Sequence, residues 1–394
     1  MTSLRACTTA RPLLAGLALA LLSAPTLANT LNQNVSWTID RSGTTAKYRV
    51  VAYGDSIYAG YNGSTTSAAK YSAPTVDAEY LAALWNADVE SVRRAKSGAV
   101  ASDVYNNKIV AERSYMQASS TRVVTFEMCG NDGLQARSSF KGQTGTCNYN
   151  VMTTAEANCK LYVARAMDYI NTNAYAGTKV KIIANLHYPG YNADNVQSSC
   201  TDAATGTRVN MRDKFLPYPG YAADNVQSSC KDAATGATVN LQTKFLPKLA
   251  TMNYWMCEYA RQKGFKCVDN FAEYMGGDYD SNGDGQIDSQ ALKYIAGETE
   301  ASYVARITGP LKGTLRDANT HFISSTSSAD YIQSDDVHPT YQGSTVRAGL
   351  FGGTTGSGAA RYTTFSAGKN PIWNLYGHER MGWLLSLYMP ASPF

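Results

Sequence analysis

The sequence lacks any concentrated positive charge. Its 35 Lys and Arg residues are nearly balanced by 31 Asp and Glu residues, and no basic run is longer than the pair Arg93–Arg94. Proteins that bind the phosphate backbone of nucleic acids gather basic residues on one face or in one segment. The balanced and evenly spread charge of this chain therefore gives no nucleic-acid footprint.

Long hydrophobic runs are also missing. The longest, Leu13–Ala24, has 12 residues, whereas a transmembrane helix needs about 18. It follows Arg5 and Arg11 and precedes the small-residue pattern Thr26–Ala28, which is the arrangement of a secretory signal peptide. We therefore expect residues 1–28 to be removed and the remaining chain, without a transmembrane segment, to be secreted to the periplasm or the extracellular space.

The cysteines do not form an even set. Cys7 lies ahead of the apolar run, which does not suit a lipid-anchored cysteine, and it is lost with the signal peptide. An oxidising compartment favours pairs, yet seven cysteines remain: Cys129, Cys147, Cys159, Cys200, Cys230, Cys257 and Cys267. We predict the short-range disulfides Cys129–Cys147 and Cys257–Cys267, which leave Cys159 to pair with Cys200 or Cys230.

A tandem duplication accounts for the odd cysteine. Residues 188–217 and 218–247 are adjacent 30-residue copies that are identical at 23 of 30 positions. A solenoid needs at least about three stacked units, so we interpret 188–247 as a duplicated insertion. Each copy carries one cysteine, and removing either copy leaves six. The insertion directly follows a predicted strand, and we expect it to form a lid or wall beside a site there.

Strand-like and helix-like segments alternate along the rest of the chain, which predicts a parallel sheet with helices on both faces. Ligands bind at the carboxyl ends of the strands in such sheets. The predicted strands are Tyr48–Tyr53, Val89–Val92, Arg122–Cys129, Lys179–Tyr188 and Phe265–Phe271, and the predicted helices are Val76–Trp85, Leu161–Ile170 and Leu249–Gly264.

Three predicted strand ends and one C-terminal motif carry the residues of a serine hydrolase. Such an enzyme needs a hydroxyl nucleophile, a histidine base, a carboxylate that orients the base, and donors to the oxyanion. We predict Ser56 as nucleophile, His338 as base and Asp335, three residues earlier, as orienting carboxylate. The backbone N–H groups of Ser56 and Gly98 and the side-chain amide of Asn131 would form the oxyanion hole.

In this order the motifs resemble the SGNH hydrolases, also called the GDSL family of lipases and esterases. Gly54–Ser56 matches their first block, with Ile57 in place of leucine, and Gly98, Gly130–Asp132 and Asp335–His338 match the second, third and fifth. An α/β-hydrolase elbow, in contrast, would need glycine where Tyr58 stands. The resemblance covers the mature core.

The resemblance implies a single domain over residues 29–394 with a flavodoxin-like three-layer α/β/α fold, a parallel central sheet and loop insertions. It implies a secreted serine ester hydrolase that cleaves carboxylic esters of lipids or acylated carbohydrates and needs no cofactor for catalysis. It also implies the same roles for Ser56, Asp335, His338, Gly98 and Asn131. One departure is Cys129, which replaces the first glycine of the third block; a disulfide through Cys129 would fix that loop instead.

The segment 278–290 resembles an EF-hand calcium loop. Ala291 occupies the position of the bidentate acid, so we expect at most a structural calcium ion. An alternative function is a catalytically inactive, calcium-dependent surface-binding module on the same fold. The candidate calcium ligands are Asp280, Asn282, Asp284, the backbone of Gln286, and Asp288.

Overall fold

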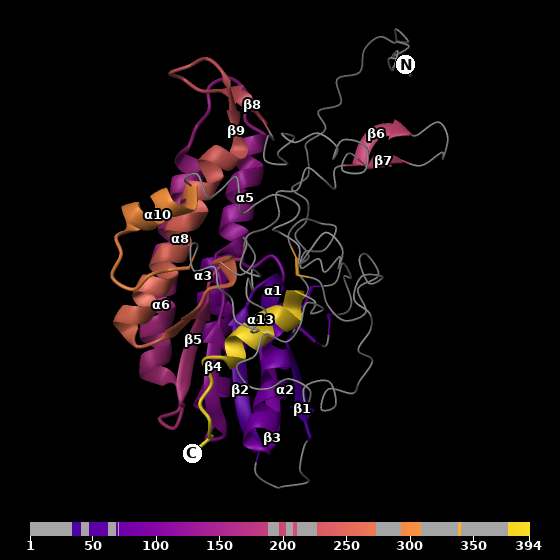
Figure 1. The fold of residues 1–394 in the computed structure, drawn as a ribbon, viewed down its shortest axis with the longest axis vertical. Helices are drawn as coiled ribbons and strands as arrows, with labels where there is room; N and C mark the ends of the chain where they lie inside the picture. The colour runs from indigo at the N-terminus through magenta and orange to yellow at the C-terminus, as the bar shows by residue number, and fades with distance from the viewer. Residues whose placement is uncertain are drawn as a thin grey trace, which may run out of the picture.

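One sheet with helices on both of its faces dominates the computed structural model of this chain (Figure 1). The strand order is β1-β3-β2-β4-β5-β10. The structure describes residues 34–40, 47–61, 68–69, 71–187, 197–201, 208–210, 227–272, 293–308, 338–339 and 377–394.

Five neighbouring strands of this sheet are parallel, and one edge strand is antiparallel. The parallel strands are β2 (Lys47–Gly54), β3 (Asp88–Ala95), β4 (Thr121–Phe126), β5 (Val180–Ala184) and β10 (Lys266–Val268). In chain order they run 2-1-3-4-5, which is the flavodoxin-like order. The antiparallel strand β1 (Val35–Ile39) pairs with β3 and was not predicted from the sequence.

The helices divide between the two faces. On one face α2 (Ala73–Trp85) packs against α13 (Gly377–Ser386). On the other, α6 (Asn150–Asn173) packs against α8 (Leu241–Lys263) and η1 (Val104–Val110). Right-handed crossovers between parallel strands require this division, because the first crossover and the later ones run in opposite directions from β2. The predicted three-layer α/β/α fold is therefore confirmed.

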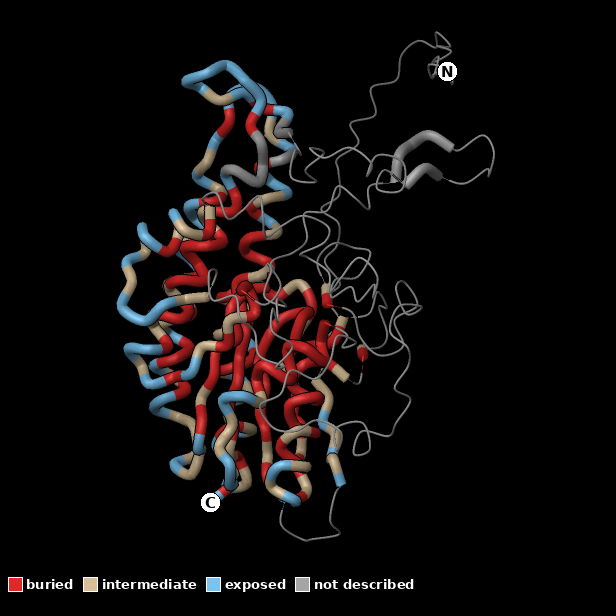
Figure 2. Tube along the Cα trace, viewed as in Figure 1, coloured by how far each residue is buried: buried red, intermediate tan, exposed pale blue. Residues whose placement is uncertain are grey.

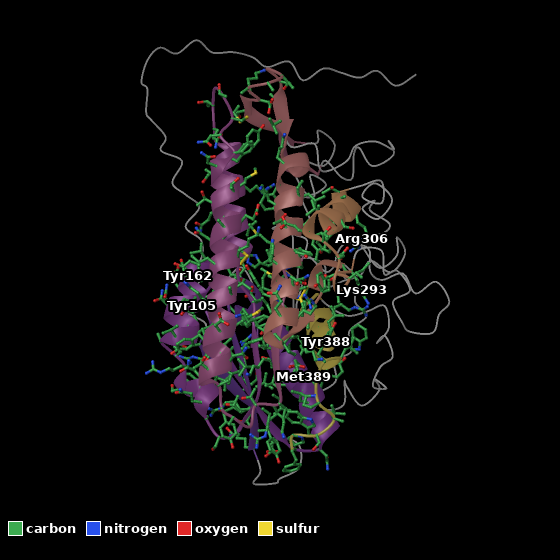
Figure 3. All side chains as sticks on the ribbon, turned by 90° about the vertical axis from the view of Figure 1, so that its left-hand side faces the viewer. Tyr105, Tyr162, Lys293, Arg306, Tyr388 and Met389 are labelled. Carbon is green, nitrogen blue, oxygen red and sulfur yellow. A yellow bond between two sulfur atoms is a disulfide. The ribbon has the colours of Figure 1, made fainter. Side chains whose placement is uncertain are left out.

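Shorter helices lie around these layers. The short helices are α1 (Ser56–Ala59), α3 (Ala101–Asp103), α4 (Ser114–Gln117), α5 (Gly130–Lys141) and α10 (Glu300–Thr308). Tyr105 of η1 lies beside Tyr162 of α6, with ring centroids 5.8 Å apart, and Arg306 of α10 donates 2.8 Å to the carbonyl of Lys293 (Figure 3).

The core follows the two central strands. Residues 50–54 of β2 are all buried, and so are residues 123–126 of β4 (Figure 2). Strands that are covered by helices on both faces read as continuous apolar runs rather than as alternating ones. Most predicted segments therefore fall on these elements. The helices were predicted too short, since α6 begins at Asn150 and α8 at Leu241, ahead of Pro247.

The two copies of the duplication form matching hairpins. In the first copy β6 (Gln197–Thr201) pairs with β7 (Arg208–Asn210), and in the second β8 (Gln227–Lys231) pairs with β9 (Thr238–Asn240). Both are antiparallel. The terminal pairs Gln197↔Asn210 and Gln227↔Asn240 lie at equivalent places in the two copies.

The second hairpin is joined to the rest of the domain. Lys231 in β8 donates 2.7 Å to the carbonyl of Gly145 and accepts 2.8 Å from the N–H of Cys147. Strand β9 runs directly into α8, whose first turns belong to the same copy. This hairpin therefore sits at the far end of α5 and α8 (Figure 1).

The disulfides correct two of the predicted pairings. Cys257 is bonded to Cys267 as predicted, but Cys129 is bonded to Cys159 and not to Cys147. Helix α5 carries the chain about 18 Å away from Cys129 at 1.5 Å per residue, and α6 then packs against it and brings Cys159 back. Cys147, left at the far end, pairs with Cys230 of the second hairpin. The side chain of Cys200 lies outside the described residues.

Among the described residues, no helix is both long and apolar enough to cross a membrane.

Candidate active site

The candidate nucleophile lies on a tight turn between β2 and α1. Strand β2 ends at Gly54, and Asp55 caps α1 by accepting 2.9 Å from the N–H of Ile57 through Oδ1. The helix lasts one turn before Gly60 ends it in the left-handed conformation. Ser56, its first residue, is 6% exposed and is held at the carboxyl end of the central strand.

The candidate base reaches this serine from 282 residues further along the chain. Nε2 of His338 lies 2.8 Å from Oγ of Ser56, which is within hydrogen-bond distance for proton transfer. Tyr61 packs against the imidazole, with ring centroids 4.3 Å apart. The contact between Tyr61 and His338 was not predicted, and the position of Tyr61 two residues after α1 was the available signal. Asp335 lies outside the described residues.

The candidate oxyanion donors come from the next two strand ends. Gly98 follows β3 with φ of 80°, a conformation that glycine adopts without strain. Asn131, in the first turn of α5, donates through Nδ2 to Asp55 Oδ2 at 3.1 Å and to the carbonyl of Ala99 at 3.0 Å. Both amide hydrogens of Asn131 therefore have protein acceptors in this structure, and the side chain is aimed at the Ser56 turn.

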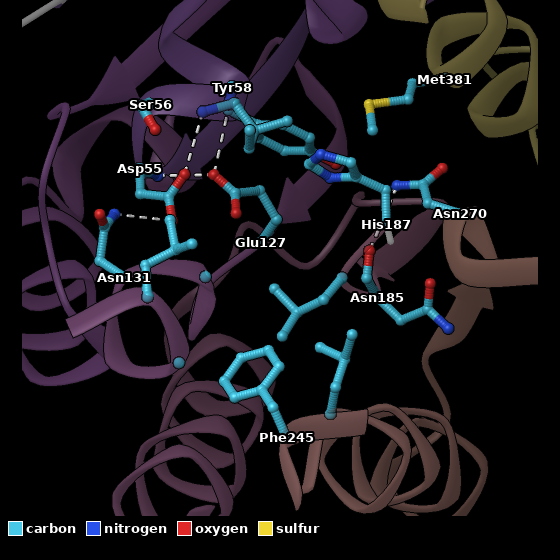
Figure 4. A pocket seen from close by; sticks show the side chains of 16 residues that line it. Asp55, Ser56, Tyr58, Glu127, Asn131, Asn185, His187, Phe245, Asn270 and Met381 are labelled. Atoms are coloured by element: carbon cyan, nitrogen blue, oxygen red, sulfur yellow. Dashed lines mark hydrogen bonds between the residues drawn. The ribbon is translucent and has the colours of Figure 1, made fainter. Parts of the chain in front are cut away.

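A buried carboxyl group, Glu127, lies directly behind the nucleophile turn and was missed from the sequence. Its Oε1 accepts from the backbone N–H of Asp55 at 2.6 Å and from that of Tyr58 at 3.4 Å (Figure 4). Glu127 is 3% exposed and Asp55 is 1% exposed. The available signal was a charged residue at the end of an apolar strand, next to the third motif.

Burial shifts the pKa values of the carboxyl groups at this site. Burial raises the pKa of Glu127 well above its usual value, and the negative charge of Asp55 raises it further. Burial also raises the pKa of Asp55, although hydrogen bonds from Glu127, Ile57 and Asn131 oppose that shift.

The third-block aspartate, Asp132, braces the turn that follows β3. Its Oδ2 accepts 2.7 Å from the N–H of Ala101. Burial raises the pKa of Asp132 to about 6, although this backbone hydrogen bond opposes the shift. Asp132 therefore fixes the segment after Gly98 relative to α5.

Cys129 occupies a left-handed position at the end of β4. Its φ is 83°, which costs a residue with a side chain roughly 1–3 kcal/mol. The disulfide to Cys159 of α6 holds this residue in place. The glycine of the resembled family is therefore replaced by a cysteine whose strained backbone is cross-linked, which agrees with the role predicted for a disulfide through Cys129.

A pocket opens beside Ser56 and Asn131 (Figure 4). Four apolar side chains that line it come from α5, the end of β5 and α8, and His187 lines it after β5. These apolar residues are Leu134, Leu186, Phe245 and Leu249. The site thus joins a serine–histidine pair to an apolar wall.

The candidate calcium segment 278–290, with Asp280, Asn282, Asp284, Gln286 and Asp288, lies outside the described residues. Within the part of the chain that is described, no group of three or more His, Cys, Asp or Glu side chains could hold a metal ion.

Comparison with known proteins gives similar folds only at low sequence identity. No family model matches the chain, and no curated protein matches it. Solved structures that are similar include an extracellular lipase from Streptomyces rimosus (14% identity, TM-score 0.37) and a phospholipase A1 from Streptomyces albidoflavus (16%, 0.36). Each comparison covers 68% of this chain and 98% of the other.

An acetylxylan esterase from Geobacillus stearothermophilus, solved as a catalytic mutant, is similar at 11% identity and a TM-score of 0.31 over 59% of this chain and 78% of that one. The chain resembles the SGNH hydrolases in the order of its motifs and in its layered fold.

Proposed function

We propose that the protein is a serine ester hydrolase that cleaves carboxylic esters through an acyl-enzyme. The observation that carries this proposal is the 2.8 Å contact between Ser56 Oγ and His338 Nε2. A hydroxyl is a weak nucleophile until an adjacent base accepts its proton, and a buried turn at a strand end holds this hydroxyl in one place.

The proposed reaction has two halves. His338 accepts the proton of Ser56 as Oγ attacks the ester carbonyl, and the imidazolium then protonates the departing alcohol. Water, deprotonated by His338, attacks the acyl-enzyme and releases the acid and the free serine. Asp335, three residues before His338, is proposed to orient the imidazole.

The oxyanion would be stabilised by the N–H groups of Ser56 and Gly98 and by the amide of Asn131. For Asn131 to donate, one of its two hydrogen bonds must open. The bond to the carbonyl of Ala99 is neutral, whereas the bond to Asp55 is made to a carboxylate and is the stronger type. We therefore expect the Ala99 bond to open as negative charge develops on the substrate.

The apolar wall of the pocket favours a substrate with an apolar group next to the ester. Leu134, Leu186, Phe245 and Leu249 offer no partner for the hydroxyl groups of a sugar, and each buried methylene contributes about 0.8 kcal/mol. The family resemblance implies two substrate classes, lipids and acylated carbohydrates. The apolar wall favours lipids, with acyl chains longer than acetyl.

Export is proposed from the N-terminal pattern and the cysteines. The apolar run Leu13–Ala24 ends in Thr26–Ala28, and disulfides such as the three in this structure persist in oxidising compartments. Secreted protein that begins at Asn29 would support export. Full-length protein that is retained in the cytosol with reduced thiols would contradict it.

The decisive experiment is Ser56→Ala, assayed with p-nitrophenyl esters from acetate to decanoate. We expect kcat to fall at least about 10⁴-fold, since removing the nucleophile of a comparable triad costs about that or more. In the wild-type protein, kcat/KM should rise from acetate to longer chains. A steady fall with chain length would contradict the apolar acyl site.

A fluorophosphonate label provides a readout that is independent of the substrate. The wild-type protein and Ser114→Ala, a control at an exposed serine on α4, should each gain one label by intact mass, and Ser56→Ala none. Labelling of Ser56→Ala would place the nucleophile elsewhere. Absence of label on the wild type, together with calcium uptake in calorimetry, would favour the inactive calcium-dependent surface-binding module.

A further inference from the structure

Two buried carboxyl groups, those of Asp55 and Glu127, lie side by side behind the nucleophile (Figure 4). Oε1 of Glu127 accepts from the N–H of Asp55 at 2.6 Å, and two carboxylates so close together in a buried site repel each other unless one of them carries a proton. Neither ion can be solvated instead, because the two residues are 1% and 3% exposed. The pair therefore carries one proton and one negative charge.

The surroundings assign the charge to Asp55 and the proton to Glu127. Asp55 accepts from the N–H of Ile57 and from the amide of Asn131, and the charge of His338 also favours its ionised form. On α1, Tyr58 donates its backbone N–H to Glu127, while its phenol is hydrogen-bonded to Thr125.

Other charged groups lie around the pair. Asp132 of α5 interacts with Asp55 as a like charge, and Asp77 of α2 interacts with Tyr58 in the same way. The groups that face the pair are thus mainly acidic, with His338 as the one that can become positive. A second negative charge on the pair would have no cation to balance it among the described residues that the structure sets against it.

The packing around Gly54 shows that the Glu127 carboxyl group is part of the structure of the nucleophile turn. A Cβ at Gly54 would overlap Oε1 of Glu127 and would come within 2.8 Å of Cβ of Tyr58. Glycine at position 54 thus allows the backbone to close onto the Glu127 carboxyl group. The hydrogen bonds of Glu127 to residues 55 and 58 span the nucleophile at 56 from both sides.

We propose that Glu127 is a positioning residue of the esterase, which acts as a neutral carboxylic acid and holds the Ser56 turn through Asp55. Its proton removes the repulsion between the two carboxyl groups, so that Asp55 remains directed at Asn131 and the oxyanion site. This proposal rests on the proposed hydrolase function, but the protonation of Glu127 can be tested without any substrate.

Loss of this proton would disable the site. Ionised Glu127 would face the Asp55 carboxylate, and like charges in a buried site repel strongly. The turn would then open, and the negative charge behind Ser56 would oppose the developing oxyanion. Burial and the negative charge of Asp55 raise the pKa of Glu127, so the neutral form persists to higher pH than in a free glutamate, and activity should fall on the alkaline side as that form is lost.

The first test is infrared spectroscopy of the wild-type protein without ligand at pH 7. We expect the C=O band of a protonated carboxylic acid, which should shift when all glutamates carry ¹³C at the side-chain carboxyl and disappear in Glu127→Gln. Asp77 is a matched control, because it is also buried with a raised pKa and its oxygens have no hydrogen-bond partner among the described residues. Its band should survive glutamate labelling and disappear in Asp77→Asn.

The second test is the pH dependence of kcat/KM with a p-nitrophenyl ester. Glu127→Gln keeps a neutral hydrogen-bonding group, so it should stay within about 10-fold of wild type at pH 7 and lose the alkaline fall. Glu127→Ala should lose about 10²-fold in kcat, as expected when a nucleophile is misplaced by about 1 Å. Asp77→Asn should retain the alkaline fall.

Two results would overturn the proposal. One is a wild-type spectrum without a glutamate acid band, which needs no variant to fold. The other is an alkaline fall in Glu127→Gln identical to that of wild type. A failure of the proposed function is distinct, since the wild type would then be inactive or Ser56→Ala would stay active, whatever the infrared band shows.

Discussion

Two neighbouring turns in this molecule each hold one residue of the candidate site in place, and they do so by different interactions. The turn after β2 places Ser56, and the turn after the adjacent strand β4 places Asn131. The first is held by hydrogen bonds that include those accepted by the carboxyl groups of Asp55 and Glu127. The second is held by a disulfide at a left-handed residue, Cys129. The serine turn thus depends on a proton, and the asparagine turn depends on the redox state.

The largest effect on this comparison should come from Gly54→Ala. The new methyl group would overlap Glu127 and contact Tyr58, so the serine turn must shift, and a shift of about 1 Å costs roughly 10²-fold in kcat. Steady-state kinetics with a p-nitrophenyl ester measures this loss. Gly142→Ala is the control, since its Cβ would find only ordinary contacts at 3.7 and 3.8 Å. Equal activity of the two variants would show that the serine turn is not tightly packed.

A smaller effect, on stability rather than on chemistry, is expected when the asparagine turn loses its cross-link. Cys159→Ala opens a loop of 30 residues, and closure of such a loop is worth about 3.6 kcal/mol in the chain-entropy model. Urea unfolding under non-reducing conditions measures the change. A free energy of unfolding equal to that of the wild type would mean that packing of α5 on α6 alone holds the turn.

The strain at position 129 can be separated from the cross-link by a matched pair. Both Cys129→Ala/Cys159→Ala and Cys129→Gly/Cys159→Ala lack the disulfide, and they differ in the residue that must adopt a φ of 83°. The glycine form should be more stable by about 1 kcal/mol, because only glycine adopts this conformation freely. The reverse order would show that the turn relaxes once the disulfide is gone.

A further effect, on the pH dependence of stability, concerns Asp132 of the asparagine turn, whose carboxyl group holds the turn after β3 through the N–H of Ala101. Its pKa is raised by burial to about 6 from an ordinary value of 3.8. A carboxyl group with a raised pKa stabilises the fold fully below its unfolded value and loses that contribution as the pH rises through its folded value. The wild type should therefore lose up to about 2 kcal/mol relative to Asp132→Asn between about pH 4 and pH 6. A difference that stays constant across urea titrations at pH 4, 5 and 7 would exclude this shift.

Much of the fold could be predicted because the central strands are apolar throughout and alternate with helical segments. β2 and β3 fall on predicted strands, and Ser56 follows β2 at the expected edge. The edge strand β1 was missed because its alternating burial over Val35–Ile39 gives only a short pattern. The early start of α8 was missed because Pro247 lies inside that helix.

The candidate site was predictable where a motif is local and less so where contacts are distant. The order of the motifs pointed to both Ser56 and His338, and the structure brings them to 2.8 Å. Glu127 was missed because its partners, residues 55 and 58, are about 70 positions away in the sequence. In the sequence alone it is a single charged residue at the end of a strand, with no visible partner. The pairing of Cys129 was predicted wrongly because spacing alone does not show where α6 turns back along α5.

The two matching hairpins make chain length an evolvable property of this protein. Each 30-residue copy carries its own hairpin, its own cysteine and the same Lys-Phe-Leu-Pro ending. Recombination between the copies would delete one of them in frame and still leave a hairpin of the same register ahead of α8. The first copy is therefore redundant and can diverge in sequence, while the second keeps its disulfide to Cys147.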